Sequence, residues 1–308
     1  MPYPTPAVTN TTAAVFIPEI WSDEIIAAYK KNLVMANLVM KMNFKGKKGD
    51  TVHLPAPTRG TASLKVAQTA VTVIADTETE VQVSINRHFE YSRFIEDITE
   101  VQALSSMRQF YTADAGYALA RAVDTDIIQL GRNANGGAGT AAYANAFIGG
   151  DGTTAYSGAN QTALTDAAIR RTIQRLDDND TSMDQRFFII PPSSRNTLMG
   201  LARYTEQAFI GSGDAIRTGE IGNLYGIPVF TTSNADTATG GARICLMGHR
   251  DSMALVEQLA VRSQVQYKQE HLSTLYTADT LYGVANLRNL ATVGAARSSS
   301  LFALAVPA

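Results

Sequence analysis

Two stretches in the first third of the chain decide the fold: FKGKKGDTVHLPA at residues 44–56 and TETEVQVSINRHFEYSRFIED at residues 77–97. Apolar residues alternate with polar ones in both stretches, at Val52, Leu54, Val81, Val83 and Ile85. A period of two is typical of a half-buried β-strand. The pattern predicts a long two-stranded antiparallel hairpin across residues 41–95, with its tip between residues 57 and 75.

The length of this hairpin has a consequence for assembly. An arm of about 15 residues spans roughly 50 Å, whereas a compact chain of 308 residues has a radius of gyration of only about 19 Å. An isolated two-stranded ribbon is also marginally stable in water. The hairpin is therefore expected to project and to contact a partner surface, most simply a neighbouring subunit.

The two arms of the hairpin carry opposite charges. Residues 41–65 are rich in lysine and contain Asp50 as their single acid, whereas residues 76–100 are acidic, with Arg87 and Arg93 as their only arginines and no lysine. Two interpretations remain open: the arms pair with each other inside the hairpin, or they dock onto neighbouring subunits. The candidates for contacts between subunits are Lys45, Lys47, Lys48, Arg59, Lys65, Glu78 and Glu80.

Helical patterns flank the hairpin on both sides. Before it, an extended, proline-rich arm leads to a helix expected from Pro18, which suits the first helical position. After it, residues 97–100 (DITE) resemble a capping box. Apolar residues then recur every three or four positions to about Leu130, and Gly131 is expected to end the helix. This helix of about 33 residues is nearly three times the mean length.

The second half of the chain favours an α/β arrangement. Residues 131–163 are rich in Gly, Ala, Asn and Thr and mark a boundary between two units. Beyond it, the apolar patterns predict a helix from Thr165, a buried strand at 186–190, a helix with Leu198, Leu201 and Tyr204, a turn and strand ending near Phe230, a strand at 242–247 and further strands up to about Ala296.

Composition excludes several classes of function. A net charge of -2 gives the chain no overall basic character for tight, sequence-independent binding to nucleic acid. The single cysteine, Cys245, excludes an intrachain disulfide framework and is expected to be a buried, inert thiol. No stretch approaches the ~18 apolar residues of a membrane span. Charged residues make up only 18% of the chain, below the average of about 25%, which suggests that neighbouring subunits cover part of the surface.

The sequence shows no constellation of catalytic, metal-binding or cofactor-binding residues. The four histidines lack metal-ligand spacing, and there is no phosphate loop and no nucleophile elbow. Residues 150–155 (GDGTTA) match the sequence pattern of a dinucleotide-binding motif, G-x-G-x-x-A. That motif requires a helix directly after it, and the residues that follow here do not favour a helix. The acidic cluster of Asp177, Asp178 and Asp180 lacks the full calcium-loop pattern. We therefore expect no enzyme, no cofactor and no metal.

The order of the elements resembles that of the HK-97-type major capsid proteins of tailed bacteriophages. Residues 44–52 are similar to the first strand of the E-loop in that family, and residues 77–97 are similar to its return into the spine helix. The segments FIIPP at 188–192 and LYGIPVF at 224–230 are similar to axial-domain segments of phage coat proteins. The resemblance extends over about residues 15–296.

This resemblance implies an α+β fold divided into named parts. They are an N-arm with a short helix at 1–40, the E-loop hairpin at 41–95, a peripheral domain with the spine helix at 96–160, an axial domain at 161–260, and return strands to the peripheral domain at 261–308.

The resemblance also implies a function and partners. The subunit would self-assemble into hexamers and pentamers of an icosahedral capsid enclosing double-stranded DNA, which it contacts non-specifically. The start of the chain is too short for a cleaved scaffolding region, so a separate scaffolding protein is expected, together with a portal and decoration proteins. Assembly would take place in the bacterial host cytoplasm, and the subunit would reside in the virion. An encapsulin-like nanocompartment shell is the alternative, and an α/β enzyme is a remote one.

Overall fold

The computed structural model describes most of the chain, namely residues 34–45, 48–56, 62–71, 73, 79–97, 106–134, 147–154, 156–201, 222–235, 239–288 and 300–308. The helix expected from Pro18 lies outside these residues, as do Tyr204 and positions 98–100 of the expected capping box.

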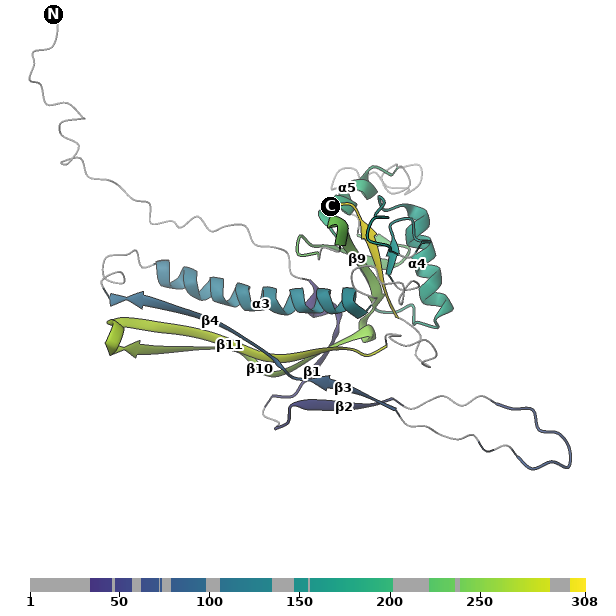
Figure 1. The fold of residues 1–308 in the computed structure, drawn as a ribbon, viewed down its shortest axis with the longest axis horizontal. Helices are drawn as coiled ribbons and strands as arrows, with labels where there is room; N and C mark the ends of the chain where they lie inside the picture. Colours follow the sequence, from purple (N-terminus) through teal and green to yellow (C-terminus); the bar gives the residue numbers. More distant parts are fainter. Residues whose placement is uncertain are drawn as a thin grey trace, which may run out of the picture.

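A four-stranded sheet and one long helix form an elongated unit (Figure 1). The strand order is β1 (Met40–Asn43), β10 (Met253–Lys268), β11 (Ser273–Asn286) and β4 (Arg87–Glu96). Strand β1 runs parallel to β10, and the other neighbours are antiparallel. Helix α3 (Ser106–Ala134) lies along one face of this sheet, and the short helix α1 (Met35–Leu38) precedes β1.

The long helix predicted from the apolar spacing is confirmed, with 29 residues in α3. The prediction that Gly131 ends the helix is wrong, because α3 continues through it to Ala134. A Cβ at Gly131 would lie 3.1 Å from a methyl group of Leu246, so this glycine lets the helix pack closely against a neighbouring strand.

A separate two-stranded sheet forms the predicted hairpin. Strand β2 (Thr51–Ala56) pairs antiparallel with β3 (Thr79–Ser84), with Thr51 opposite Ser84 and Ala56 opposite Thr79. The paired strands are shorter than expected, since each has six residues. The outer ends of the predicted hairpin, at 41–43 and 87–95, belong instead to the four-stranded sheet.

A six-stranded sheet forms the second unit. Its order is β5 (Phe147–Gly149), β12 (Leu301–Val306), β9 (Arg243–His249), β6 (Arg186–Ile190), β8 (Ile227–Thr231) and β7 (Asn223–Leu224). Helices α4 (Asp166–Asp178) and α5 (Pro192–Met199) accompany it. The predicted helix from Thr165 is confirmed, because the Thr165 side chain caps α4 by accepting a hydrogen bond from the Ala168 N–H.

The other patterns of the second half are largely confirmed. The predicted strand at 186–190 is β6, which is buried at every position, and the strands predicted near Phe230 and at 242–247 are β8 and β9. The strands expected toward Ala296 are β10 and β11, which ends at Asn286, and residues 289–296 lie outside the described residues. The helix expected to include Leu201 is shorter, because α5 ends at Met199.

The last strand, β12, lies in another sheet than expected, because residues 261–308 were predicted as return strands to the peripheral domain. It lies between β5 and β9, and all six of its residues are buried. Residues 301–306 therefore lie in the six-stranded sheet, whereas β10 and β11 lie in the four-stranded one. A strand that is covered on both faces shows a continuous apolar run, here LFALAV, so the alternation that signals a strand is missing.

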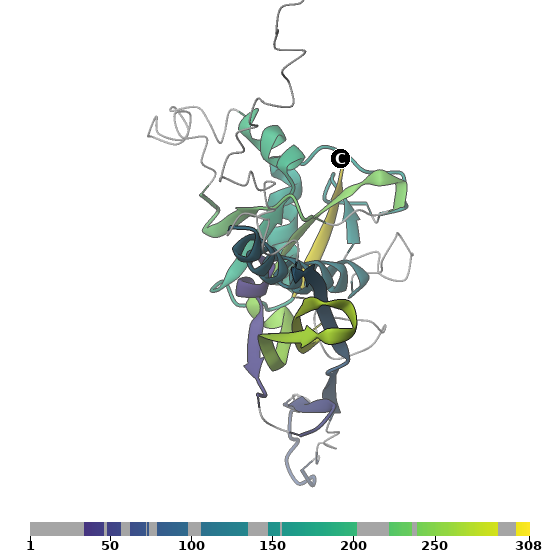
Figure 2. The same ribbon diagram turned by 90° about the vertical axis from the view of Figure 1, so that its left-hand side faces the viewer.

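Helix α3 connects the two units. Its residues Ile127 and Ile128 belong to one buried cluster with Leu255 of the four-stranded sheet and Leu246 of the six-stranded sheet. Figure 2 shows the β2–β3 hairpin, in purple and blue, at the opposite end of the molecule from the unit that holds α4 and α5. Short 3-10 helices at Thr239–Gly241, Arg250–Ser252 and Gln269–His271 complete the described elements. None of the helices that the structure describes is long and apolar enough to cross a membrane.

Candidate assembly surfaces

The base of the hairpin is fixed to the four-stranded sheet, on the face opposite α3. Val52, Val83 and Ile85 are buried there and pack against Val256 of β10. The adjacent residue of β10, Leu255, points the other way and packs in the cluster that includes α3, because successive side chains of a strand alternate between faces. The inner half of this sheet therefore lies between the hairpin base and α3.

Gly283 of β11 makes this close approach possible. A Cβ at position 283 would collide with the Ser84 carbonyl oxygen and would lie 3.1 Å from the Ile85 Cα. Both contacts are to backbone, which cannot rotate away as a side chain can. The direction in which the hairpin leaves the sheet is therefore set by the absence of a side chain at this position.

We predict that Gly283→Ala displaces the hairpin base and lowers the free energy of unfolding by about 1–3 kcal/mol, as overpacking does elsewhere. Thermal unfolding of the purified subunit measures this effect. The matched control is Gly116→Ala, because a Cβ at Gly116 of α3 would meet nothing within 4 Å, and alanine is a better helix former. Equal stability of the two variants would contradict the role of Gly283.

The tip of the hairpin exposes apolar side chains. Leu64 is 95% exposed and Val73 is 85% exposed, and Val66 and Val71 are also exposed. A tight turn lies between the two sides of the tip, where the Thr69 N–H and hydroxyl both donate to the Val66 carbonyl oxygen. A row of exposed aliphatic residues at the end of a projecting ribbon indicates a surface that another molecule covers.

The charged candidates that the structure describes, Lys45, Lys48, Lys65 and Glu80, do not form one cluster. The Lys45 ammonium lies 3.9 Å from the Glu257 carboxylate on β10. Glu80 contacts the His53 ring nitrogen across the hairpin at 3.0 Å, and hydrogen bonds from Gln82 and His53 hold the pKa of Glu80 below its usual value. Of the other five candidates, the exposed ones are Lys48 and Lys65, and those outside the described residues are Lys47, Arg59 and Glu78.

Among the described residues, the two arms are joined by one pair of this kind, between His53 and Glu80. Among the described candidates, Lys45 pairs with the four-stranded sheet and Glu80 pairs with a histidine. Such exposed pairs contribute little to stability. Docking of these charges between subunits stays a prediction.

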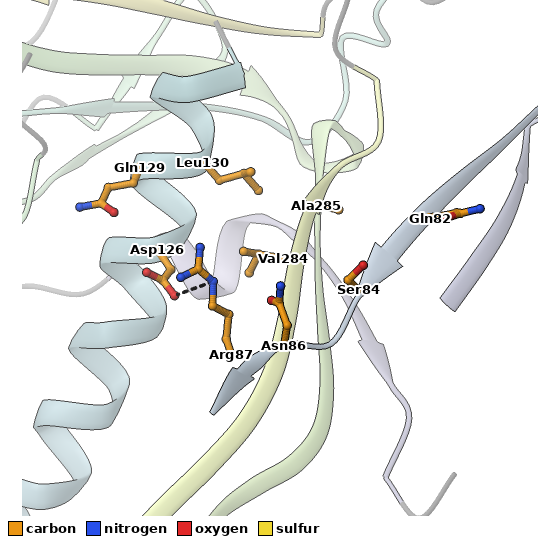
Figure 3. A pocket seen from close by; sticks show the side chains of 9 residues that line it. All are labelled: Gln82, Ser84, Asn86, Arg87, Asp126, Gln129, Leu130, Val284 and Ala285. Atoms are coloured by element: carbon orange, nitrogen blue, oxygen red, sulfur yellow. Dashed lines mark ion pairs between the residues drawn. The ribbon is translucent and has the colours of Figure 1, made fainter. Parts of the chain in front are cut away.

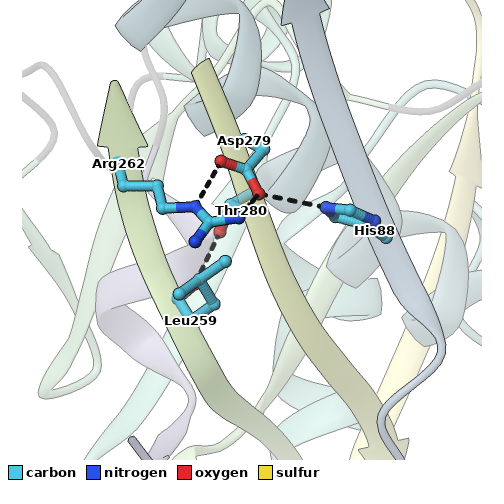
Figure 4. Close-up of polar contacts among 5 residues, drawn as sticks. All are labelled: His88, Leu259, Arg262, Asp279 and Thr280. Atoms are coloured by element: carbon cyan, nitrogen blue, oxygen red, sulfur yellow. Dashed lines mark hydrogen bonds and ion pairs between the residues drawn. The ribbon is translucent and has the colours of Figure 1, made fainter. Parts of the chain in front are cut away.

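A polar network crosses three strands on the sheet face opposite α3 (Figure 4). Asp279 of β11 accepts two hydrogen bonds from the Arg262 guanidinium, at 2.8 and 3.0 Å, and contacts His88 Nε2 at 3.1 Å. These partners hold the pKa of Asp279 below its usual value, with Arg262 contributing most. Beside them, the Thr280 hydroxyl donates to the Leu259 carbonyl oxygen, where β10 is irregular.

We predict that Asp279→Asn is less stable than the wild type at pH 7. Because the folded chain lowers this pKa, the stabilisation is present above the unfolded value of about 3.9 and is lost as the pH falls through the folded value. The difference in melting temperature should therefore close in acid. Thermal melts between pH 7 and pH 3 test this, with Glu270→Gln at an exposed position as the control. A difference that stays constant with pH would contradict the ion-pair argument.

A polar cleft lies where the hairpin, β4, α3 and β11 meet (Figure 3). Its volume is about 270 Å³. The polar side chains of its lining are Gln82, Ser84, Asn86, Arg87, Asp126 and Gln129. Arg87 and Asp126 face each other at 3.9 Å. The Tyr282 hydroxyl donates to Asp126 at 2.8 Å, and burial together with this bond raises the pKa of Tyr282.

The lining of this cleft does not point to catalysis. The cleft holds amides, a serine hydroxyl, one arginine and one carboxylate, but no histidine, lysine or cysteine. No group of three or more His, Cys, Asp or Glu side chains within the described ranges is placed to hold a metal ion. Cys245 is buried and contacts the Ser194 hydroxyl, and burial raises the pKa of its thiol to about 12. It is therefore an inert thiol, as predicted.

Two sequence features that resembled binding motifs have structural roles. In the GDGTTA stretch, the Asp151 carboxylate accepts hydrogen bonds from the Thr153 and Thr154 N–H groups and closes a turn after β5. The next helix, α4, begins only at Asp166, so the stretch has no helix directly after it. Asp177 of the acidic cluster accepts a hydrogen bond from Arg186 at 2.6 Å and so fixes the end of α4 to β6.

Sequence reasoning missed Asp124, which joins three parts of the fold. This carboxylate is fully buried on α3 and accepts a hydrogen bond from the Met35 N–H at 2.7 Å and one from the Asn234 amide at 3.0 Å. Further backbone N–H groups at the start of α1 also bond to it, and burial raises its pKa. One signal was available, because Asp124 lies four residues before Ile128, on the buried face of the helix.

The fold matches those of phage capsid structures. A chain of Mycobacterium phage Che8 aligns with a TM-score of 0.74 and 21% identity, covering 94% of this chain and 97% of that one. The capsid structure of the cyanophage P-SCSP1u gives a TM-score of 0.73 and 17% identity, with 96% and 94% covered. The mature capsid of bacteriophage PhiM1 gives 0.69 and 14%, with 94% and 92% covered. The predicted HK-97-type fold is thereby confirmed.

A comparison with curated protein sequences found no match. The comparison with family models, in contrast, matches residues 27–295 to the family described as phage capsid protein. That range spans the hairpin, α3, the four-stranded sheet and most of the six-stranded sheet. The chain therefore belongs to the phage capsid protein family.

Proposed function

We propose that this chain is the major capsid protein of a tailed phage, which assembles into hexamers and pentamers of an icosahedral head around double-stranded DNA. The observation that carries the proposal is the projecting hairpin with its exposed aliphatic tip, in a chain that belongs to the phage capsid family. Such a tip is unfavourable in an isolated subunit, because its apolar surface stays in water. A shell of repeated subunits gives it a surface to cover.

Each structural unit takes a part in this shell. The β2–β3 hairpin serves as the E-loop, and α3 with the four-stranded sheet serves as the peripheral domain. The six-stranded sheet with α4 and α5 serves as the axial domain, to which residues 301–306 contribute a strand. Residues 1–40 would supply the N-arm and its short helix.

The partners follow from the same role. A separate scaffolding protein and a portal would direct assembly in the host cytoplasm, and decoration proteins would bind the finished head. With a net charge of -2, the subunit would contact packaged DNA weakly and without sequence preference. A structural role of this kind requires no catalysis.

Negative-stain electron microscopy of the expressed chain, alone and with the scaffolding partner, tests the proposal. Closed particles of uniform size are the expected result. A chain that stays a monomer or dimer in light scattering, with no particles, would contradict the proposal and favour an enzyme. Particles that copurify with a protein cargo instead of DNA would indicate the encapsulin-like alternative.

A further inference from the structure

The outer half of helix α3 has an exposed face. Ala120, Tyr117 and Ala113 precede Asp124 at intervals of three or four residues, so these side chains lie on one face of the helix. Ala113 and Ala120 are exposed and Tyr117 is partly exposed, whereas Asp124 is buried. Figure 1 shows the four-stranded sheet along a different side of α3, and the six-stranded unit at only one of its ends. The face is therefore covered at Asp124 and exposed toward the start of the helix.

Helix α1 covers this face at Asp124 and shows the direction of the chain. The Met35 N–H at the start of α1 donates to Asp124 at 2.7 Å. Val39, directly after α1, belongs to the same buried cluster as Ile127 and Ile128. Helix α1 thus runs along α3 in the direction of increasing residue number. The residues before Met35 are therefore expected to lie toward the start of α3.

The segment before α1 has an amphipathic sequence. Residues 18–33 lie outside the described part of the chain, and their sequence predicts a helix in which an apolar residue recurs at every fourth position: Trp21, Ile25, Tyr29 and Leu33. The charged residues of the segment would lie on the opposite side of this helix: Glu19, Asp23, Glu24, Lys30 and Lys31. An isolated helix of this length is marginally stable in water, so packing of its apolar side on a partner would stabilise it.

The segment and the exposed face have similar lengths. At a rise of about 1.5 Å per residue, a helix over residues 18–33 is about 24 Å long, and the stretch from Ser106 to Asp124 is about 27 Å long. Counting back from the start of α1 at the same rise places Tyr29 near Ala120. The small side chain of Ala120 would let a second helix approach closely, since the distance between packed helices depends on the side chains at the contact.

We propose that residues 18–33 form a helix that packs, within the same chain, on the α3 face of Ala113, Tyr117 and Ala120. This inference goes beyond shell assembly, because it describes the unassembled subunit. Packing would remove the apolar stripe of the segment from water. It would also keep this stripe from joining copies of the chain before a shell forms.

The short connection favours packing within one chain over packing on a second copy. The segment ends directly before Val34, and the N–H groups of Val34 and Met35 both bond to the Asp124 carboxylate. A segment tethered by so short a linker meets its own α3 at an effective concentration on the order of millimolar. A second copy in dilute solution would not compete with this contact.

The fluorescence of Trp21 tests the packing, because Trp21 is the only tryptophan of the chain. In the unassembled subunit we expect blue-shifted emission and protection from quenching by acrylamide, both unchanged by dilution. Ala120→Glu should shift the emission to that of the urea-unfolded chain, because it places a charge beneath the apolar stripe. The matched control is Gln129→Glu, which adds a charge at an exposed position on another side of α3 and should change neither property.

Three results would overturn the inference. Emission of the native subunit at the wavelength of the unfolded chain would show that the segment does not pack. Protection that disappears on dilution would show that the segment packs on a second copy. Protection that survives in Ala120→Glu would show that the segment packs on a different surface.

Disulfide formation gives an independent readout. A chain that carries both Tyr29→Cys and Ala120→Cys should form an intrachain disulfide when the unassembled subunit is oxidised, and peptide mapping detects it. Cys245 is fully buried, so it adds little background. A chain with Tyr29→Cys and Gln129→Cys is the control and should form no such bond. Disulfide-linked dimers from a mixture of the Tyr29→Cys and Ala120→Cys single variants would contradict packing within one chain.

Failure of this inference can be distinguished from failure of the shell function. A subunit whose Trp21 is protected but which never forms particles would refute the shell function and leave the inference intact. Normal particles from a subunit whose Trp21 is exposed before assembly would refute the inference and leave the shell function intact.

Discussion

Deletion of residues 57–75 is expected to abolish shell assembly while the rest of the subunit stays folded. The register places Ala56 opposite Thr79, so the deletion leaves residues 76–78 as a three-residue connection, a length that hairpins commonly use. The paired strands β2 and β3 and their anchor of Val83 and Ile85 on the sheet are retained. The removed segment contains the exposed aliphatic tip and no part of the described cores.

The expected magnitude follows from the apolar surface that the tip offers. Leu64, Val66, Val71 and Val73 are exposed in the subunit, and burying one such side chain contributes about 1.5–3 kcal/mol. Loss of about 3 kcal/mol or more per contact weakens association by roughly a hundredfold or more. Many such contacts act together in a shell, so particle yield by sedimentation and electron microscopy should fall below detection.

Two measurements separate this effect from misfolding. The melting temperature of the unassembled subunit should change little, since the deletion removes no buried residue of the described structure. A Gly/Ser segment of the same length in place of residues 57–75 serves as the control for loop strain and should also fail to assemble. Normal particles from either variant would contradict the assembly role of the tip.

The hairpin could be predicted from the sequence because one of its faces is buried. Val83 and Ile85 show a period of two, since each second residue packs on the sheet. The same period continues through β4, where Phe89 and Tyr91 pack in the cluster with α3 instead. Periodicity indicates which face of a strand is buried, but it does not indicate with which other strand it pairs. The predicted hairpin therefore included residues 41–43 and 87–95, which pair with β10 and β11.

The features that were missed depend on contacts distant in sequence. Strand β12 is covered on both faces and so shows no alternation. Gly131 was interpreted as a helix end, but its role is set by Leu246, far along the chain. For the candidate site, the sequence identified the hairpin and its charges. The close approach of the hairpin base to Gly283 could not be found, because it depends on the backbone of Ser84 and Ile85, far away in the sequence.

Replacement of Asp124 by alanine is expected to cause the largest loss of stability of any single substitution considered for this chain. Asp124 lies on α3, and its carboxylate accepts hydrogen bonds from the Met35 N–H at the start of α1 and from Asn234 beyond β8. It thereby ties the short helix α1, the long helix and the segment after β8 together. Alanine would leave several buried donors without an acceptor, each at a cost of about 1–3 kcal/mol.

We expect Asp124→Ala to lower the free energy of unfolding by about 3–5 kcal/mol, because several buried donors lose their acceptor at once. Asp124→Asn is the matched variant, because it keeps the shape and one acceptor oxygen. Its loss should be smaller, since the Asn234 amide can turn to present its oxygen to the new NH2 group beside Thr125. Denaturant titration of the unassembled subunit measures both, and equal losses would contradict the role of the acceptor oxygens.

The pH dependence of the Asn variant gives a second test, opposite in sign to that of Asp279. Burial raises the pKa of Asp124, so the folded chain binds this proton more tightly than the unfolded chain does. As the pH falls through the raised value toward about 3.9, the wild type gains stability relative to Asp124→Asn. The deficit of the variant should therefore widen in acid, whereas that of Asp279→Asn should close. A deficit of Asp124→Asn that also closes in acid would show that charge attraction, and not a desolvated set of hydrogen bonds, holds this carboxylate.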